Sequence, residues 1–555
     1  MNTLIINKKK TSTWTLNTEF NYLIHKSYLP ACLALSIALS GCTKLGPDFV
    51  KPEAPNLESW SKTDAADIKK QAVDYSSWWN VFNDPILNQL VETSRKDNLT
   101  LQVAGLRILE ARALLGIAIG DKYPQTQDVV AGYSFVSSSE NAPNAAQLDH
   151  NYSRGRIGLD TAWELDFWGR FERGIEAANA RLGATIADYD DIMIALNAQV
   201  STTYVVIREL EERLERAREN VAVQKRTLEI AQVRFRGGAV TELDVQQARA
   251  LLRDTQALIP VLKTQLHQSR NALSVLLATP PNKLDTILGE SGAIPQAPVD
   301  VAIGIPADLL RRRPDIRRAE LDAAIQSARI GIAKADLYPR FTLVGFIGFE
   351  AGGGSTDSRS NNSSLNDIFD ADSFTGSFGP SLRLPFFNYG RLKNNVRIQD
   401  ARFQELAVNY QNTVLRAYQE VEDSLTGFLQ SQDQTQFLSD SVKASKRSTD
   451  LALLQYRRGI VDYVRVLDSQ RFLVNQQDRL AQSRSSIALN LIATYRALGG
   501  GWESRDLNTL VPDSMLQEMK ARTDWGDLLP ATDLEKAPQT GEEAGKTTVK
   551  HSPDW

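Results

Sequence analysis

A seven-residue hydrophobic repeat dominates residues 170–236 of this chain. Two interleaved series of positions carry the repeat, and no proline interrupts it. The first series is Leu182, Tyr189, Leu196, Thr203, Leu210, Ala217 and Gln224, and the second is Ile186, Met193, Val200, Ile207, Leu214, Val221 and Leu228. Such a repeat is typical of a coiled-coil-like helix that packs along one stripe. We therefore expect a helix about 100 Å long, which is too long for an ordinary globular domain.

Four other segments alternate between hydrophobic and polar residues. They lie at residues 129–135, 157–165, 341–349 and 378–384. A period of two predicts β-strands with one apolar and one polar face. Strands of about ten residues suit a membrane crossing. We therefore expect four amphipathic transmembrane strands.

The chain repeats one plan with an offset of roughly 220 residues, which predicts two structural repeats. The first repeat, residues 85–280, is expected to contain a helix over 85–118, two strands, the long helix and a return helix. The second, residues 314–500, is expected to have the same order. Residues 281–313 are then an equatorial linker, and residues 501–555 a C-terminal equatorial segment with a disordered tail.

Sharp turns are predicted where each long helix meets its return helix. The turn residues are Arg236, Gly237, Gly238 and Thr241 in the first repeat, and Arg458, Gly459 and Asp462 in the second. Glycine can adopt the left-handed conformation that closes a helix. Thr241 is expected to cap the first return helix, with Asp244 three residues later, and Asp462 to cap the second.

Residues 1–41 are predicted to be the signal peptide of a lipoprotein. An apolar run at 29–39 follows several lysines and is too short to span a bilayer. It ends in Leu39-Ser40-Gly41-Cys42, which resembles the lipobox of bacterial lipoproteins. Cleavage would make a lipid-modified Cys42 the first residue, and residues 42–84 would form a tether. The alternative is an ordinary signal peptide followed by a chance cysteine.

Composition excludes several classes of function. The net charge of -4 gives no basic surface for nucleic acid. The four histidines are scattered and form no cluster with cysteine, so we expect no metal and no cofactor. No nucleophile with a neighbouring base is visible, and we expect that the protein is not an enzyme.

Four strands cannot span a membrane alone, because an open sheet leaves backbone groups unpaired in lipid. Two copies would give eight strands, whose interior is filled by side chains. Three copies give twelve, an even number suited to a barrel with a bore. A homotrimer is therefore the smallest assembly expected to conduct.

Several motifs, in their order and spacing, resemble the outer membrane factor (TolC-type) family, and within it the NodT/OprM-like lipoproteins. They are Tyr123-Pro124, Phe167-Trp168-Gly169-Arg170, Arg234-Phe235-Arg236-Gly237-Gly238, Leu309 to Glu320, Tyr338-Pro339 and Tyr456-Arg457-Arg458-Gly459. The resemblance implies a mixed α and β membrane protein. Its trimeric 12-stranded β-barrel in the outer membrane continues into a long periplasmic α-helical barrel, with a small mixed equatorial region.

The resemblance also implies a role and partners. Such channels are exit ducts for drugs or other small toxic compounds. They dock on a periplasmic adaptor protein and an inner-membrane pump, usually of the resistance-nodulation-division type. The turn residues named above would meet the adaptor, although the glycines could serve only to close the helices.

Asp468 matches an aspartate that rings the periplasmic entrance of the family, where three carboxylates would attract cations. Arg465 stands where some relatives carry a second aspartate, which leaves a double acidic ring in doubt and suggests instead a salt bridge at Arg465 that holds the entrance shut. The resemblance thus makes Asp468 and Arg465 residues of a periplasmic gate. Asp244 and Gln247 are the equivalent positions in the first repeat. The alternative for Asp468 is a carboxylate on a solvated helix face.

Two other functions stay open at this point. A lipid-anchored periplasmic coiled-coil scaffold without a pore would explain the long helices, but not the four strands. A channel for type I protein secretion is the other alternative.

Overall fold

The computed structural model describes residues 43–55, 60, 68–69, 75–137, 139, 141, 151–298, 301–302, 312–354, 365–503 and 510–529. The chain divides into two compact units. The first unit includes residues 121–173 and 331–394 and holds a β-sheet, and the second holds two helical hairpins. The predicted signal peptide, Cys42 and the predicted disordered tail beyond residue 529 lie outside the described residues.

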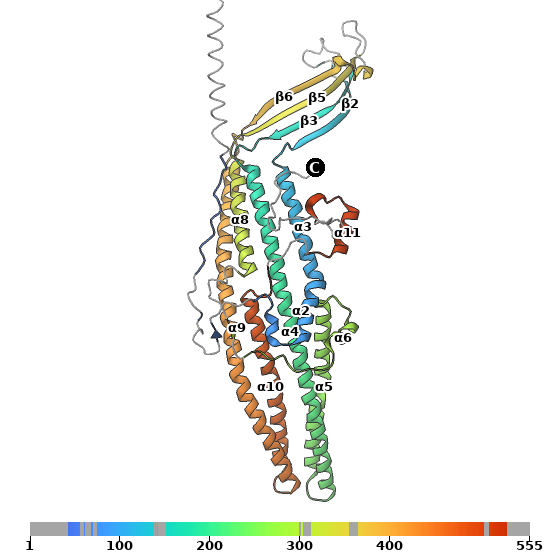
Figure 1. Cartoon of the computed structure of the whole chain (residues 1–555), viewed down its shortest axis with the longest axis vertical. Coiled ribbons are helices and arrows are strands. Elements are labelled where there is room, and N and C mark those ends of the chain that lie inside the picture. Colours follow the sequence, from blue (N-terminus) through green and yellow to red (C-terminus); the bar gives the residue numbers. More distant parts are fainter. Residues whose placement is uncertain are drawn as a thin grey trace, which may run out of the picture. The chain divides into compact units, whose positions relative to one another are not determined.

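Helices account for most of the described chain (Figure 1). They are α2 (Pro85–Asp97), α3 (Leu99–Gly120), α4 (Arg170–Arg236), α5 (Glu242–Leu276), α6 (Leu284–Leu288), α8 (Pro314–Ala335), α9 (Arg391–Arg457), α10 (Tyr463–Ala497) and α11 (Asp513–Arg522). The strands are β1 (Ile68–Lys69), β2 (Thr126–Ser137), β3 (Asn151–Glu164), β4 (Val301–Ala302), β5 (Arg340–Gly354) and β6 (Phe374–Arg383). The two-residue strands β1 and β4 pair in parallel.

Matching helices of the two repeats have equal lengths. α3 and α8 each contain 22 residues, α4 and α9 each contain 67, and α5 and α10 each contain 35. The two internal repeats expected from the sequence are therefore confirmed in the order and length of their elements.

The helix predicted over residues 85–118 is instead two helices, α2 and α3, that meet at Asn98. Asn98 has an extended backbone, with φ −63° and ψ 123°. Its Oδ1 accepts a hydrogen bond from the N–H of Leu101 at 3.0 Å, as an N-cap side chain does. Its Nδ2 donates to the carbonyl of Leu276 at 2.9 Å. The apolar spacing continues across this break, so periodicity alone did not reveal it.

The seven-residue repeat of α4 is buried, as its pattern predicts. Its members are buried except for Ile186 and Leu228, which are half-buried. Near the middle of α4, Leu210, Leu214 and Ala217 form an apolar cluster with Leu262 of α5. This cluster packs α5 against the middle of α4 in the first helical hairpin.

A buried arginine joins α4 to the C-terminal end of α6. Arg208 is 1% exposed, and its guanidinium pairs with Glu211 at 2.8 Å. It also donates to the carbonyls of Leu288 and Glu290, each at 2.9 Å, and to the hydroxyl of Tyr204 at 3.2 Å. These bonds give the buried guanidinium a full set of partners. They also hold α4 in a fixed position against residues 288–290.

The four-stranded sheet has the strand order β2-β3-β5-β6, with every neighbouring pair antiparallel. The strands are longer than their alternating segments, because pairing continues into both polar loops; β2 has 12 residues and β3 has 14. β2 and β6 are the outer strands, and each pairs on one side only among the residues that the structure describes.

The register places the alternating apolar positions on one face of this sheet. One row across the four strands reads Val129, Leu159, Ile347 and Gly376, and the next reads Ala131, Ile157, Phe349 and Phe374. The opposite face carries Arg154 with Glu350 and Arg156 with Asp160 as ion pairs at 2.7 Å. The ring of Phe346 also lies on this polar face, and the guanidinium of Arg156 covers it at 3.6 Å from the ring centroid.

Among the described residues, none of the helices combines the length and apolarity that a membrane crossing requires.

Replacement of Arg208 by methionine should lower stability by about 2 to 5 kcal/mol, because two carbonyls lose their donor and the buried carboxylate of Glu211 keeps only Arg270 as an ion-pair partner. The measurement is thermal unfolding of the purified protein followed by circular dichroism. Arg216→Met is the matched control, because Arg216 is 40% exposed at its ion pair with Glu219. An equal loss of stability in both variants would contradict a special role for the Arg208 cluster.

Candidate functional site

The two turns that join each long helix to its return helix are built alike. In the first turn Gly238 has φ +69°, and the N–H of Ala239 donates to the carbonyl of Arg234 at 2.9 Å. In the second, Gly459 has φ +78°, and the N–H of Ile460 donates to the carbonyl of Gln455 at 2.9 Å. This is the six-to-one bond that closes a helix through a left-handed glycine.

The predicted side-chain caps of the return helices are wrong. Thr241 and Asp462 do occupy the N-cap positions of α5 and α10, with extended backbones, but neither side chain accepts a capping hydrogen bond. The backbone bonds of the tight turns satisfy carbonyls at the ends of the long helices, and they do not replace side-chain caps on the first N–H groups of the return helices. Both cap side chains are exposed, so they are available to another molecule.

All the predicted adaptor-contact residues lie on the exposed surface of these turns. They are Arg236, Gly237, Gly238, Thr241, Arg458, Gly459 and Asp462. Apolar side chains are exposed beside them, including Ile460 at 65% and Val464 at 46%. The turns therefore form a mixed apolar and basic surface within the second unit.

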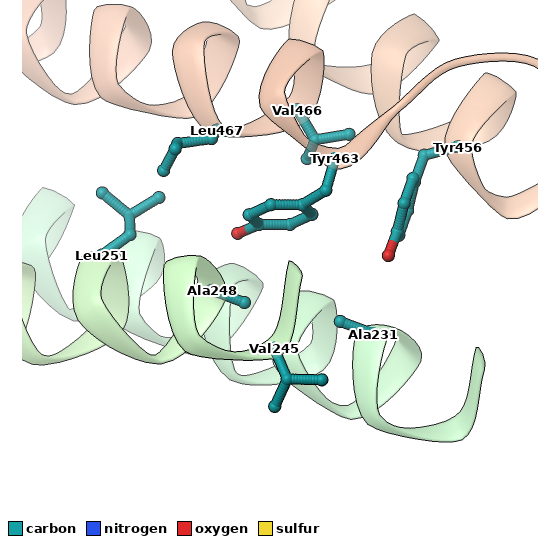
Figure 2. Close-up of a cluster of buried hydrophobic side chains, with 8 residues drawn as sticks. All are labelled: Ala231, Val245, Ala248, Leu251, Tyr456, Tyr463, Val466 and Leu467. Carbon is teal, nitrogen blue, oxygen red and sulfur yellow. The ribbon is translucent and has the colours of Figure 1, made fainter. Parts of the chain in front are cut away.

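A buried apolar cluster joins the two helical hairpins just behind the turns (Figure 2). It consists of Ala231, Val245, Ala248, Leu251, Tyr456, Tyr463, Val466 and Leu467. The two tyrosine rings pack edge to face, with centroids 5.5 Å apart. Because the cluster draws from α4, α5, α9 and α10, it fixes the first hairpin against the second, α9 with α10.

Tyr456 links this apolar cluster to two charged residues, Asp244 and Arg234. Its hydroxyl donates to Asp244 at 3.2 Å, and its ring lies 4.5 Å from the guanidinium of Arg234. Arg234 also donates to the carbonyl of Tyr456. Burial, reinforced by the carboxylate of Asp244, raises the pKa of Tyr456 to about 12. The phenol therefore stays neutral at physiological pH and keeps its proton for Asp244.

Away from the turns, the contact between α4 and α10 is polar. Gln470 donates to Thr227 at 3.0 Å, and Asn220 donates to Gln477 at 2.8 Å. Arg213 pairs with Asp478 at 2.7 Å, and Arg484 pairs with Glu212 at 3.0 Å. Beside Thr227, the amide of Gln224 is buried without a hydrogen-bond partner among the described residues. Polar contacts can be exchanged for water, so this part of the interface resists separation less than an apolar core does.

The four predicted gate residues fall into two different environments. Arg465 and Asp468 lie on the exposed face of α10, and neither forms an ion pair within the described part of the chain. Asp244 and Gln247 on α5 are half-buried. Asp244 is held by Tyr456, whereas Oε1 of Gln247 is buried without a partner among the described residues. The structure thus brings Asp244 into the contact between hairpins and leaves Asp468 free to face outward.

The pattern analysis missed Tyr456 and Arg234 as polar contacts of this site. The sequence patterns place Tyr456 and Arg234 only within motifs, Tyr456-Arg457-Arg458-Gly459 and Arg234-Phe235-Arg236-Gly237-Gly238. The internal repeat held a usable signal, because Phe235 occupies the position 221 residues before Tyr456. A phenol in place of a phenyl ring at a seam position indicates a hydrogen bond.

Residues 45 and 46, which follow Cys42 closely, are hydrogen-bonded to the region where α4 begins. The N–H of Leu45 donates to the carbonyl of Trp168 at 3.1 Å. Arg173, which is 3% exposed, donates to the carbonyls of Leu45 and Gly46 at 3.1 and 3.2 Å. The predicted tether is therefore anchored within a few residues of its start.

Comparison with known proteins matches this architecture. A family profile described as "Outer membrane efflux protein" matches residues 90–279 and 305–500, more than half of the chain. The chain belongs to the outer membrane efflux protein family. The two matched stretches correspond to the two repeats, and the hairpins described above lie within them.

The similarity to other members of this family extends over nearly the whole length of those proteins. The Pyoverdine export outer membrane protein OpmQ of Pseudomonas putida is 30% identical over 85% of this chain and 97% of its own. Nodulation protein T of Rhizobium leguminosarum bv. trifolii is 31% identical over 84% of this chain and 96% of its own. The solved structure of the outer-membrane channel OprN has a TM-score of 0.75 and 31% identity, over 82% of this chain and 99% of its own.

We expect Tyr456 to titrate near pH 12 in the folded protein. Because its pKa is raised above the unfolded value of 10, the stabilisation is fully present below pH 10 and is lost as the pH rises through 12. The measurement is the ultraviolet absorbance of ionised tyrosine, as the difference between wild type and Tyr456→Phe. A difference signal with a midpoint near pH 10 would contradict the buried contact with Asp244.

Proposed function

We propose that three copies of this chain form a tunnel that conducts small toxic compounds passively from the periplasm to the outside. The observation that carries the proposal is the four-stranded sheet with one apolar face and two outer strands that lack a partner on one side. In lipid such a sheet must close with other copies, and three copies give the bore described above. A periplasmic scaffold would have no need of this sheet, and nothing in the described residues favours protein secretion.

The exposed turns are the proposed docking surface for a periplasmic adaptor protein, which would join the tunnel to an inner-membrane pump of the resistance-nodulation-division type. These turns expose arginines, Arg236 and Arg458, beside the apolar side chain of Ile460. Exposed arginine beside apolar surface is typical of protein interfaces. Cys42 is the proposed lipid attachment site, and the anchored residues that follow it would hold the lipid near the outer membrane.

The entrance is proposed to open by movement of α9 and α10 away from α4 and α5. The division follows the contacts between the hairpins. Away from the turns these contacts are polar and can be exchanged for water, whereas at the turns an apolar cluster has to separate. The bond from Tyr456 to Asp244 belongs to that cluster, so it would break when the hairpins part. Asp468, repeated three times around the axis, would supply a cation-selective ring, and Arg465 an adjoining basic one.

Single-channel conductance in a planar bilayer tests the tunnel and its entrance together. Wild type should give small, cation-selective openings. Asp468→Ala should reduce the cation selectivity, because the ring of carboxylates is lost. Arg465→Ala should raise the conductance by removing three like charges from a narrow entrance. Tyr456→Phe should raise the open probability without a change in selectivity.

Asp254→Ala is the matched control, since Asp254 is an exposed carboxylate of α5 away from the turns. It should behave as wild type. Absence of conductance from folded, lipidated protein in every variant would favour the scaffold over the tunnel. Conductance with unchanged selectivity in Asp468→Ala would agree with a tunnel but contradict the role of Asp468 in its cation selectivity.

A further inference from the structure

Two hydrogen bonds of the same kind join α4 to α10 behind the turns. Gln470 donates to Thr227 at 3.0 Å, and Asn220 donates to Gln477 at 2.8 Å. The two bonds lie seven positions apart on each helix, and the helices run in opposite directions. The register between α4 and α10 is therefore constant over this stretch.

Gln224 lies between these two bonds and takes part in neither. It is on the same stripe of α4, because it follows Asn220 by four positions and precedes Thr227 by three. Its side chain is 2% exposed, and neither Oε1 nor Nε2 has a hydrogen-bond partner among the described residues. The register places Leu473, a buried residue of α10, at the same level. The amide of Gln224 is therefore buried against an apolar surface.

An unpaired amide is unfavourable at a seam position, where an apolar side chain would lose nothing. A polar residue at such a position lowers stability, and it is retained where it selects one arrangement of helices over another. The second repeat has no such amide. The counterpart of Gln224, 221 positions later, is Ser445, whose hydroxyl donates to the carbonyl of Ser441 at 2.6 Å. The unpaired amide therefore belongs to the contact between α4 and α10, and not to the repeated plan.

A complementary group for Gln224 lies one helical turn away. Gln470 is 3% exposed, and its Oε1 is also buried without a partner among the described residues. It is bonded to Thr227, which lies one turn beyond Gln224 on the same stripe. Two carboxamides can bond to each other, because each carries a donor and an acceptor. The two glutamines are thus neighbours that could pair but do not pair in this arrangement.

Side-chain length determines when each bond to Gln470 can form. The hydroxyl of Thr227 is attached to Cβ, whereas the amide atoms of Gln224 lie two carbon atoms further out. The bond to Thr227 therefore requires close approach of α4 and α10, and a small separation breaks it. A bond between two glutamines spans a wider gap, so it suits helices that have begun to part.

We propose that Gln224 is a positioning residue of the entrance, which binds the amide of Gln470 when α10 begins to part from α4. The inference rests on the opening movement proposed above. In the closed arrangement Thr227 holds Gln470, and the unpaired amide of Gln224 raises the free energy of that arrangement. In the partly parted arrangement Gln224 replaces Thr227 as the partner, so the movement has an intermediate position with its own hydrogen bond.

A double-mutant cycle measured by single-channel conductance tests this pair. Thr227→Val keeps the shape of the side chain but removes the hydroxyl. It should raise the open probability roughly threefold to tenfold, the range that one neutral hydrogen bond supplies, because Gln470 turns to Gln224. Addition of Gln224→Leu should abolish this rise. Gln224→Leu alone should lower the open probability and raise the temperature of thermal unfolding, because the closed arrangement no longer buries an unpaired amide.

Two further variants serve as controls for the cycle. Thr227→Ser retains a hydroxyl and should behave as wild type. Ser445→Ala alters the counterpart of Gln224, which is 6% exposed, and should leave the rise caused by Thr227→Val intact. An equal rise in Thr227→Val with and without Gln224→Leu would overturn the pair, and would leave buried water as the partner of Gln224.

Thiol labelling gives a second measurement that does not depend on conductance. Leu480 is 7% exposed and lies on the same stripe of α10, one heptad beyond Leu473. Leu480→Cys should react with a maleimide faster in the Thr227→Val background, and at the original rate when Gln224→Leu is added. Protein without the added cysteine gives the background rate.

The two measurements separate this inference from the proposed tunnel. Absence of conductance in every variant, together with the expected labelling rates, would overturn the tunnel and keep the pair of amides. Conductance in every variant, together with equal labelling rates in all backgrounds, would overturn the pair and keep the tunnel.

Discussion

Backbone hydrogen bonding in lipid is the constraint on which this structure depends. The four strands of one chain form three pairs that satisfy their backbone hydrogen bonds. The outer edges of β2 and β6 lack such pairs among the described residues. Water could satisfy the open edges in a soluble protein, but hydrocarbon cannot. The chain is therefore incomplete as a monomer at its membrane end, and its apolar sheet face has a purpose only in an assembly.

In the helical unit, the contacts within the hairpins differ from the contacts between them. The first hairpin has an apolar interior at the cluster of Leu210, Leu214 and Leu262. In the second hairpin, polar bonds such as that between Thr435 and Ser483 also join α9 to α10. Between hairpins the contacts are mostly hydrogen bonds and half-exposed ion pairs, apart from the cluster around Tyr456 and Tyr463. Strong packing within bodies and weaker, exchangeable contacts between them are the conditions under which rigid helices can move against one another.

Periodicity predicted much of this fold, because both unusual patterns extend over many residues. The seven-residue repeat predicted α4, and the period of two placed the apolar faces of all four strands correctly. Features that depend on single side chains were not predictable in the same way. Asn98 interrupts a helix without interrupting its apolar spacing, and Thr241 and Asp462 have the chemistry of caps but not the bonds. The contact between Tyr456 and Asp244 joins residues 212 positions apart, which no local pattern encodes.

The equal lengths of matching helices limit how this protein can change in evolution. α4 and α9 have 67 residues each, and α5 and α10 have 35 each. A deletion of one heptad from a single long helix would displace its turn by about 10 Å relative to the other, and the cluster that joins the hairpins would be lost. Insertions and deletions in these rods are therefore tolerated only when all four helices change by the same number of turns. Shortened or lengthened versions of this chain should differ from it in sets of four matched heptads, rather than in isolated gaps.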